Sequence, residues 1–196
     1  MPVLKSTGKS ILYVALSVDG YIAGENDDLS FLSLVEVPGE DYGYSEFMKS
    51  IDASIMGRKT IDWVIEHEKG FLEKIGLIYI ITHRPLPEFM SRNPNIVSFE
   101  GNVSDLTRDL MEQGKNLFIV GGAEIILPLM KDGLIDEFQL AVIPVLLGKG
   151  TLLFKPGFPK TMLRITETRK YPSGLVMLRY EREQNHASLV DARENN

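Results

Sequence analysis

Residues 51–60 read Ile-Asp-Ala-Ser-Ile-Met-Gly-Arg-Lys-Thr, an apolar run that ends in a basic, glycine-bearing loop and is followed by helix-like sequence. Three more apolar runs end in comparable loops: residues 11–16 before Ser-Val-Asp-Gly, residues 77–81 before Thr-His-Arg-Pro, and residues 117–120 before Gly-Gly-Ala. Near-continuous apolar strands that alternate with amphipathic segments are typical of a parallel sheet buried on both faces, and ligands bind such sheets beyond the carboxyl ends of the strands. The sequence therefore predicts an α/β fold with all four loops along one edge.

The periodicity of the remaining sequence predicts the other elements. Strands are expected at about 10–17, 51–56, 77–82, 95–99 and 117–120, and helices at about 41–50, 59–67, 104–113 and 123–131. Alternation then predicts a strand at about 136–143, and the turn at 171–174 predicts an antiparallel hairpin at about 163–171 and 175–182. Residues 19–39 are expected to be irregular, and residues 20–29 within them resemble a lid more than a structural connection. The expected sheet is mostly parallel, with an antiparallel hairpin at its carboxyl end.

Composition limits the classes of protein that the chain can represent. Its 196 residues, 44% hydrophobic and 24% charged, fit a single domain over residues 1–183 with a polar tail at 184–196. A net charge of −6 argues against a nucleic-acid surface, and the lack of cysteine excludes disulfides, thiolate metal sites and a cysteine nucleophile. No apolar run reaches the roughly 18 residues of a membrane span, and no leader precedes Ile11. We expect a cytoplasmic protein without a metal, a membrane or a nucleic acid as partner.

The loop Gly57-Arg58-Lys59-Thr60 carries the strongest chemical signal, because it lies at the start of a predicted helix. A helix amino terminus presents free N–H groups and a partial positive charge, so two further cations there are unfavourable unless an anion is bound. A phosphate would resolve this conflict. Alternatively, both side chains extend into solvent and Thr60 caps the helix. The loop lacks the spacing of an ATP-binding P-loop.

A second basic pair, His83 and Arg84, follows the next predicted strand. If both loops face one ligand, their charge exceeds what a pyrophosphate needs and favours NADP over NAD. Arg84 is the better phosphate ligand because its guanidinium matches phosphate geometry, whereas a histidine beside a proline can equally be a surface residue.

Two glycine-rich segments complete the candidate site. Gly121-Gly122-Ala123 allows a pyrophosphate to approach the backbone, although it could be no more than a sharp strand-to-helix turn. The second segment is Gly148-Lys149-Gly150-Thr151. Its glycines could border a flat ring, or the loop could need them for positive φ angles.

Taken together, the motifs at residues 15–23, 56–60, 120–124 and 144–150 resemble those of the dihydrofolate reductase superfamily. The likeness is greatest to the reductase domain of bifunctional riboflavin-biosynthesis enzymes and to its stand-alone bacterial relatives, and it covers about residues 9–182. The resemblance implies a three-layer fold, a homodimer, and hydride transfer from NADPH to a flat nitrogen heterocycle.

The resemblance also implies roles for individual residues. Those implied at the nicotinamide are Ala15, Ile22 and Ala23; those at the adenosine side are Gly57, Arg58, Lys59, Thr60, Thr82, His83 and Arg84; those at the pyrophosphate are Gly121, Gly122, Ala123, Glu124 and Ile125. The substrate loop would contain Leu147, Gly148, Gly150 and Thr151. Asp41 takes the place of the carboxylate that assists pterin protonation in folate reductases, but it could instead cap a helix. Tyr44 is a candidate for an aromatic wall beside the acceptor, although such residues are often core.

Three functions remain open from the sequence. The first is an NADPH-dependent reductase of a small pterin- or pyrimidine-like heterocycle. The second is a reductase of 5-amino-6-(ribosylamino)uracil phosphate, which would need basic residues for the substrate phosphate that Asp27, Asp28 and the acidic stretch 36–41 do not offer. The third is a regulatory protein that binds NADP without turnover.

Overall fold

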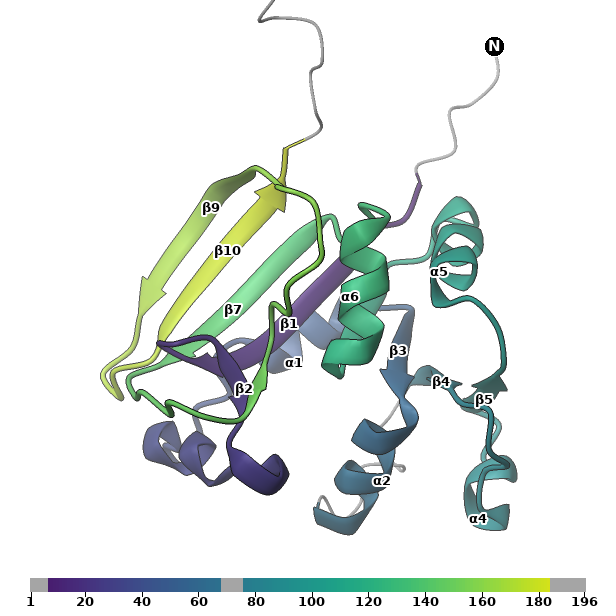
Figure 1. Cartoon of the computed structure of the whole chain (residues 1–196), viewed down its shortest axis with the longest axis horizontal. Helices are drawn as coiled ribbons and strands as arrows, with labels where there is room; N and C mark the ends of the chain where they lie inside the picture. The colour runs from purple at the N-terminus through teal and green to yellow at the C-terminus, as the bar shows by residue number, and fades with distance from the viewer. Residues whose placement is uncertain (1–6, 68–75, 184–196) are drawn as a thin grey trace, which may run out of the picture.

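The computed structural model describes residues 7–67 and 76–183, and an eight-stranded sheet forms its centre (Figure 1). The strands of this sheet are β1 (Ser10–Ser17), β3 (Ala53–Gly57), β4 (Leu77–Ile81), β5 (Ile96–Phe99), β6 (Leu117–Gly121), β7 (Glu137–Ile143), β9 (Leu163–Lys170) and β10 (Val176–Arg182), and their spatial order is β5-β4-β3-β6-β1-β7-β10-β9. A separate small ribbon joins β2 (Tyr21–Ala23) to β8 (Thr151–Leu152).

The strand directions agree with the pattern in the sequence. β1 pairs in parallel with β6 on one side and with β7 on the other, and β3, β4 and β5 extend the parallel part. β10 then runs antiparallel to β7, and β9 runs antiparallel to β10. The predicted fold class, a mostly parallel sheet with an antiparallel carboxyl-terminal hairpin, is confirmed.

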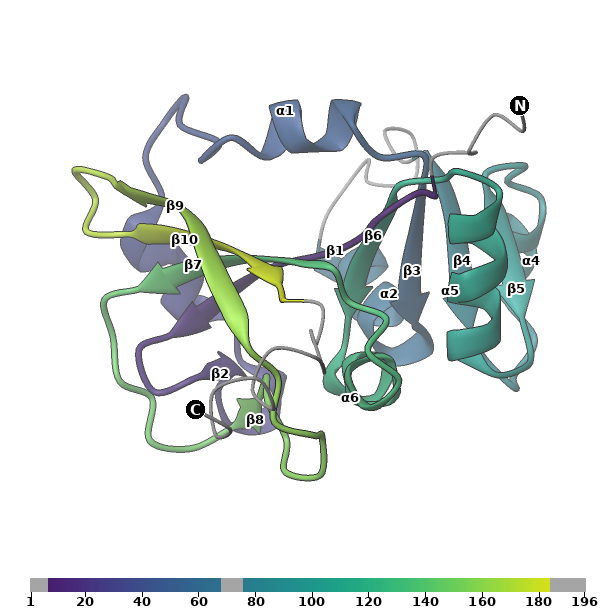
Figure 2. The same cartoon turned by 90° about the horizontal axis from the view of Figure 1, so that it is seen from above.

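Helices cover both faces of the sheet and give three layers (Figures 1 and 2). They are α1 (Tyr44–Lys49), α2 (Arg58–His67), α4 (Glu88–Ser91), α5 (Val103–Glu112) and α6 (Ala123–Lys131), with the 3-10 helices η1 (Glu25–Asp27) and η2 (Ser30–Val35). Leu106 of α5 and Leu129 of α6 pack with Leu12 on one face, whereas Phe47 of α1 packs with Ile11 on the other. Side chains alternate along a strand, so β1 contributes to two separate cores.

Several short elements were not expected from the sequence, and one expected helix has different bounds. The predicted lid contains strand β2, whose partner β8 lies about 130 residues further along the chain, so no local pattern reveals it. The proline-rich stretch after β4 contains the short helix α4, which begins directly after Pro87. Helix α1 is shorter than expected and begins at Tyr44.

The predicted tail at 184–196 lies outside the described residues. Within residues 7–67 and 76–183, no helix has the length and apolar character needed to cross a membrane.

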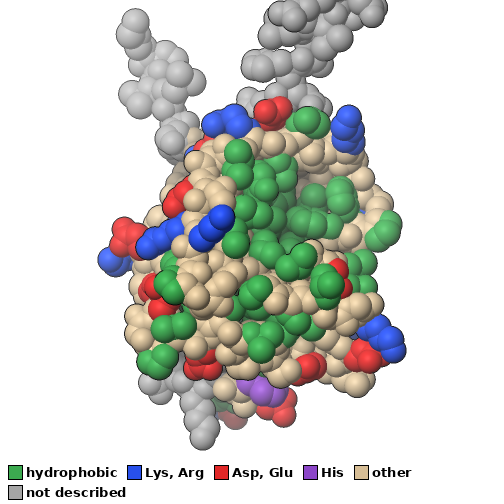
Figure 3. Space-filling model, turned by 90° about the vertical axis from the view of Figure 1, so that its left-hand side faces the viewer, with side chains coloured by type: hydrophobic (Ala, Val, Ile, Leu, Met, Phe, Trp, Pro, Cys, Tyr) green, Lys and Arg blue, Asp and Glu red, His purple; other side chains and the backbone are tan. Residues whose placement is uncertain are grey.

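Strand β9 forms one edge of the sheet, and every one of its residues after Leu163 is exposed. Met162, just before β9, and Ile165, on β9, are 52% and 51% exposed. Figure 3, which faces this side, shows hydrophobic side chains gathered into a broad patch. An exposed edge strand beside apolar side chains is a surface on which another chain can pair.

Candidate active site

The carboxyl ends of the parallel strands lie along one edge of the sheet, as predicted. The paired registers place Gly57 at the end of β3 beside Ile81 at the end of β4, and pair Met56 with Gly121 at the end of β6. β1 and β7 end together at Ser17 and Ile143. The four loops identified in the sequence are therefore neighbours in space.

The two helices that follow β3 and β6 begin close to each other. A β-carbon added to Gly57 would lie 3.2 Å from Ile125 Cγ1, and one added to Gly122 would lie 3.4 Å from Thr60 Oγ1. Among the described residues other than its chain neighbours, no further atom lies within 4 Å of that position on Gly122, so little side-chain material covers this backbone. The amino termini of α2 and α6, with their free N–H groups, thus meet at a gap bordered by Gly122, which suits an anion that must approach the backbone.

Arg58, the first residue of α2, already has an anionic partner within the chain. Its Nε donates to Asp62 Oδ1 at 2.7 Å, and its Nη1 donates to the Pro85 carbonyl at 2.9 Å. The charge conflict inferred from the sequence is therefore relieved for Arg58 by Asp62, one turn along the same helix. This corrects the argument that two cations at this helix start require an external anion. Lys59 differs: it is exposed, and within the described residues it forms no salt bridge.

The loop after β4 holds Thr82, His83 and Arg84 in different surroundings. Thr82 is buried, and its Oγ1 accepts a hydrogen bond from the Arg84 N–H at 3.0 Å. His83 pairs with Glu100 at 3.2 Å, whereas Arg84 Nη2 lies 3.6 Å from Asp62 Oδ2. Arg84 is thereby brought to the start of α2, while the His83 side chain is directed to Glu100 at the end of β5.

The first turn of α6 contains Ala123, Glu124 and Ile125, of which Ala123 and Ile125 are buried. The Glu124 carboxylate accepts a hydrogen bond from Lys155 at 2.5 Å, and this bond holds the pKa of Glu124 below its usual value. Glu124 is therefore ionised at neutral pH. An anion bound at this helix start would be held by backbone N–H groups rather than by the Glu124 side chain.

Asp19, which the sequence analysis left without a role, joins two loops that are far apart in the chain. Its carboxylate accepts hydrogen bonds from Ser17 Oγ at 2.6 Å and from the backbone N–H groups of Leu147 and Gly148 at 3.1 and 2.7 Å. The hydrogen bond from Ser17 is the main reason that the pKa of Asp19 is lowered. The substrate loop is thus anchored to the end of β1.

The ribbon of β2 and β8 continues this anchoring. Gly150 has a φ of +133°, and a β-carbon on it would lie only 2.0 Å from the Ala23 carbonyl oxygen. Thr151 pairs with Ala23 in the ribbon. The residues implied at the nicotinamide, Ile22 and Ala23, are therefore held by the segment that the sequence suggested as the substrate loop.

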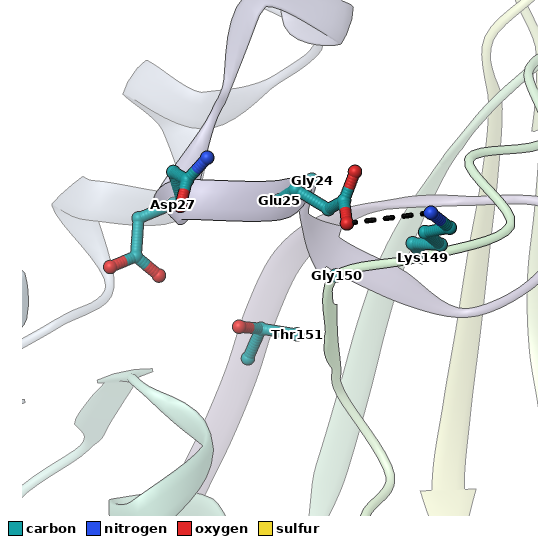
Figure 4. A pocket seen from close by; sticks show the side chains of 7 residues that line it. Gly24, Glu25, Asp27, Lys149, Gly150 and Thr151 are labelled. Carbon is teal, nitrogen blue, oxygen red and sulfur yellow. Dashed lines mark ion pairs between the residues drawn. The ribbon is translucent and has the colours of Figure 1, made fainter.

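An open cavity of about 570 Å³ lies next to this ribbon and is lined by residues 24–27 and 149–151. Figure 4 shows the side chains of Glu25 and Lys149 directed toward each other, and their charged atoms are 3.6 Å apart. Asp27 lies apart from that pair in the same view. The only cation in the lining is therefore paired, and the cavity has no free positive charge among its lining residues.

An aromatic cluster packs beside the end of β6. The Tyr13 ring stacks on Phe47 at 4.8 Å, and Phe47 meets Phe118 edge-on at 5.1 Å. Val120, the residue before Gly121, packs against the same cluster. Tyr44, 39% exposed, places its ring 5.7 Å from that of Tyr13. Tyr13 shares one face of β1 with Ala15, one of the residues implied at the nicotinamide.

The candidate residues Tyr44 and Asp41, and Tyr13 beside Tyr44, have clear protonation states. Burial raises the pKa of Tyr13 to about 12 and raises that of Tyr44, so both phenols are neutral at physiological pH. Asp41 accepts hydrogen bonds from the backbone N–H groups of Gly43 and Ser45 at 2.9 and 3.0 Å. A hydrogen bond involving the Ser45 side chain is the first cause of its lowered pKa. Asp41 is thus an ionised group that orders the turn before α1, and this geometry favours the helix-capping interpretation over a proton donor.

The layered sheet, its strand order and its antiparallel hairpin define a protein of the dihydrofolate-reductase-like class. Residues 9–177 match the model of the RibD C-terminal domain, and the chain belongs to this family. The resemblance stated from the sequence motifs is therefore confirmed.

Individual relatives agree with this assignment. The chain is 36% identical over 174 residues to the uncharacterized protein YwjB of Bacillus subtilis, covering 89% of this chain and 98% of that protein. A crystal structure of a putative riboflavin biosynthesis protein from Shewanella sp. PV-4 is 25% identical, with a TM-score of 0.80 over 90% of this chain and 99% of the other. A deaminase/reductase of Thermotoga maritima, 14% identical with a TM-score of 0.67, shares the fold over 92% of this chain and 58% of its own.

Proposed function

We propose that this protein is an oxidoreductase that transfers a hydride from NADPH to a small, flat, pterin- or pyrimidine-like heterocycle. The observation that carries the proposal is the meeting of the amino termini of α2 and α6 at Gly122, where an added β-carbon would contact only Thr60 Oγ1, at 3.4 Å, apart from its chain neighbours. Membership of the RibD C-terminal domain family supports the assignment to the oxidoreductases.

The residues present fit such a cofactor. Gly121, Gly122 and the first turn of α6 would hold its pyrophosphate, with Gly57 and Thr60 facing them from the start of α2. Lys59 and Arg84 are the exposed cations available for a ribose phosphate, and Ala15, Ile22 and Ala23 would border the nicotinamide. When bound, the cofactor supplies the hydride, and the protein supplies position and exclusion of water.

The acceptor that fits the cavity is uncharged or weakly cationic. Glu25 and Asp27 line the cavity, and Lys149 is already paired with Glu25. A substrate phosphate would have to be desolvated there without a free cation, which is unfavourable. This argues against 5-amino-6-(ribosylamino)uracil phosphate as the acceptor, although the family and the names of its relatives keep that reaction as the alternative within the same fold.

The choice between reductase and regulatory binder is tested by turnover. Purified protein is offered NADPH with dihydrofolate, flavins and diaminopyrimidinones, with and without a ribose phosphate, and the loss of NADPH absorbance is followed. We expect oxidation with at least one phosphate-free acceptor. Tight NADPH binding without oxidation by any member of the panel would favour the regulatory binder, and turnover confined to the phosphorylated pyrimidinone would favour the riboflavin-type reaction.

We predict that NADPH binds at least about tenfold more tightly than NADH. Exposed Lys59 and Arg84 provide charge-assisted contacts to a ribose phosphate, each worth roughly 1.5–3 kcal/mol. Quenching of Trp63, the single tryptophan of the sequence, serves as the readout. Equal affinities for the two cofactors would contradict the placement of the adenosine end at these residues.

We also predict a homodimer of two 22.0 kDa chains that pairs through the exposed side of β9. Ile165→Lys should raise the dissociation constant of the dimer by about tenfold or more, since it buries a charge in an apolar contact. Phe89→Lys is the matched control, because Phe89 is 56% exposed on α4 near the other edge of the sheet. Light scattering that finds only monomer across micromolar concentrations would refute the dimer.

A further inference from the structure

The carboxylate of Asp62 lies between two arginines, Arg58 at the start of α2 and Arg84 in the loop after β4. Arg58 Nε donates to Asp62 Oδ1 at 2.7 Å, and Arg84 Nη2 stands 3.6 Å from Asp62 Oδ2. Arg58 and Asp62 come from one helix and Arg84 from the loop after β4, so Asp62 connects two segments that border the proposed adenosine end.

The two arginines are held to different degrees. The Arg58 side chain is 16% exposed and is also fixed by its hydrogen bond to the Pro85 carbonyl at 2.9 Å. The Arg84 side chain is 66% exposed, and its separation from Asp62 exceeds hydrogen-bond length. An exposed ion pair of this kind contributes little to stability, so another anion can replace Asp62 as the partner of Arg84.

We propose that Asp62 is a specificity-determining residue that limits the preference of the protein for a 2′-phosphorylated adenosine cofactor. This inference rests on the proposed function. A ribose phosphate that binds Arg84 must replace the Asp62 carboxylate as its partner, and it also brings a second negative charge close to that carboxylate. Both effects oppose NADPH. Neither opposes NADH, whose ribose hydroxyl is uncharged and can donate a hydrogen bond to a carboxylate.

The test uses the full chain and two fragments of the cofactor, adenosine 2′,5′-bisphosphate and 5′-AMP, measured by calorimetry. Asp62→Asn keeps the size of the side chain and removes its charge. We expect the affinity for the bisphosphate to rise about three- to tenfold while that for 5′-AMP changes less than about twofold. In the double variant with Arg84→Ala and Asp62→Asn, this gain in affinity for the bisphosphate should disappear.

Glu167→Gln is the matched control. Its carboxylate is 43% exposed, against 42% for Asp62, and is paired with an arginine at 2.8 Å, but on β9 at the far end of the sheet. This variant should leave both affinities unchanged. Thermal unfolding of every variant shows whether it is folded.

The outcomes separate the inference from the function on which it rests. If wild-type protein binds both fragments and Asp62→Asn leaves their affinity ratio unchanged or lowers it, the inference is wrong, and Asp62 then acts by positioning Arg58. If folded wild-type protein binds neither fragment nor NADPH, the proposed function is wrong, and the inference about Asp62 is then wrong as well.

Discussion

Gly122→Val is expected to abolish NADPH binding while leaving the protein folded. The Gly122 backbone has φ −72° and ψ −161°, extended angles that other residues adopt, and an added β-carbon would meet only Thr60 Oγ1, at the ordinary distance of 3.4 Å. The valine methyl groups would then occupy the gap between the starts of α2 and α6. Because these methyl groups would occupy the space proposed for the pyrophosphate and block its approach to the backbone N–H groups, affinity should fall about a hundredfold or more.

The control for this variant is Gly76→Val, at a glycine that also has open space around its β-position but lies before β4. Both variants should unfold within a few degrees of wild type, and only Gly122→Val should lose the quenching of Trp63 by NADPH. Normal binding by a folded Gly122→Val protein would show that the pyrophosphate lies elsewhere.

Gly150→Ala is expected to affect the nicotinamide end of the cofactor and not the adenosine end. Its β-carbon would lie 2.0 Å from the Ala23 carbonyl oxygen, at a residue whose φ is +133°. Steric overlap and backbone strain together should destabilise the fold by about 2–5 kcal/mol, mostly by separating β2 from β8. Since Ile22 and Ala23 would move with β2, turnover should fall more than tenfold while adenosine 2′,5′-bisphosphate binds as before.

Gly148→Ala is the control that separates the effect of backbone strain at a positive φ from the effect of steric overlap with a neighbouring segment. Gly148 also has a positive φ, +72°, but nothing lies within 4 Å of its β-position, so this variant should cost only about 1 kcal/mol and retain turnover. A Gly150→Ala protein with the turnover of wild type would remove Ile22 and Ala23 from the nicotinamide site.

The parts of the site that the sequence predicts are those with local signals. The loop at Gly57 follows a buried strand and begins a helix, and the same holds for Gly121 and Gly122, so their common edge follows from the alternation of elements alone. The ion pair between Arg58 and Asp62 was also within reach, because the two residues are four apart on one helix. The prediction of an external anion at this helix start leaves out this partner within the helix.

Other features depend on partners that no local pattern reveals. Asp19 meets Leu147 and Gly148 across nearly 130 residues of chain, and β2 finds β8 across a similar span. The aromatic cluster likewise joins Tyr13 of β1 to Phe47 and to Phe118. Only the assembled fold brings these residues together, and their spacing along the sequence gives no indication of it.

The central place of β1 has a consequence for how the chain acquires its structure. β1 is the first strand to be synthesised, yet its two neighbours, β6 and β7, begin only at Leu117 and Glu137. On a ribosome the β1 segment therefore has no neighbouring strand until β6 has emerged, and it gains the second only when β7 follows. Non-local pairing of this kind slows folding and leaves the nascent chain open to aggregation. Fragments that end before Ile143 should consequently be recovered only with a chaperone bound or as insoluble material.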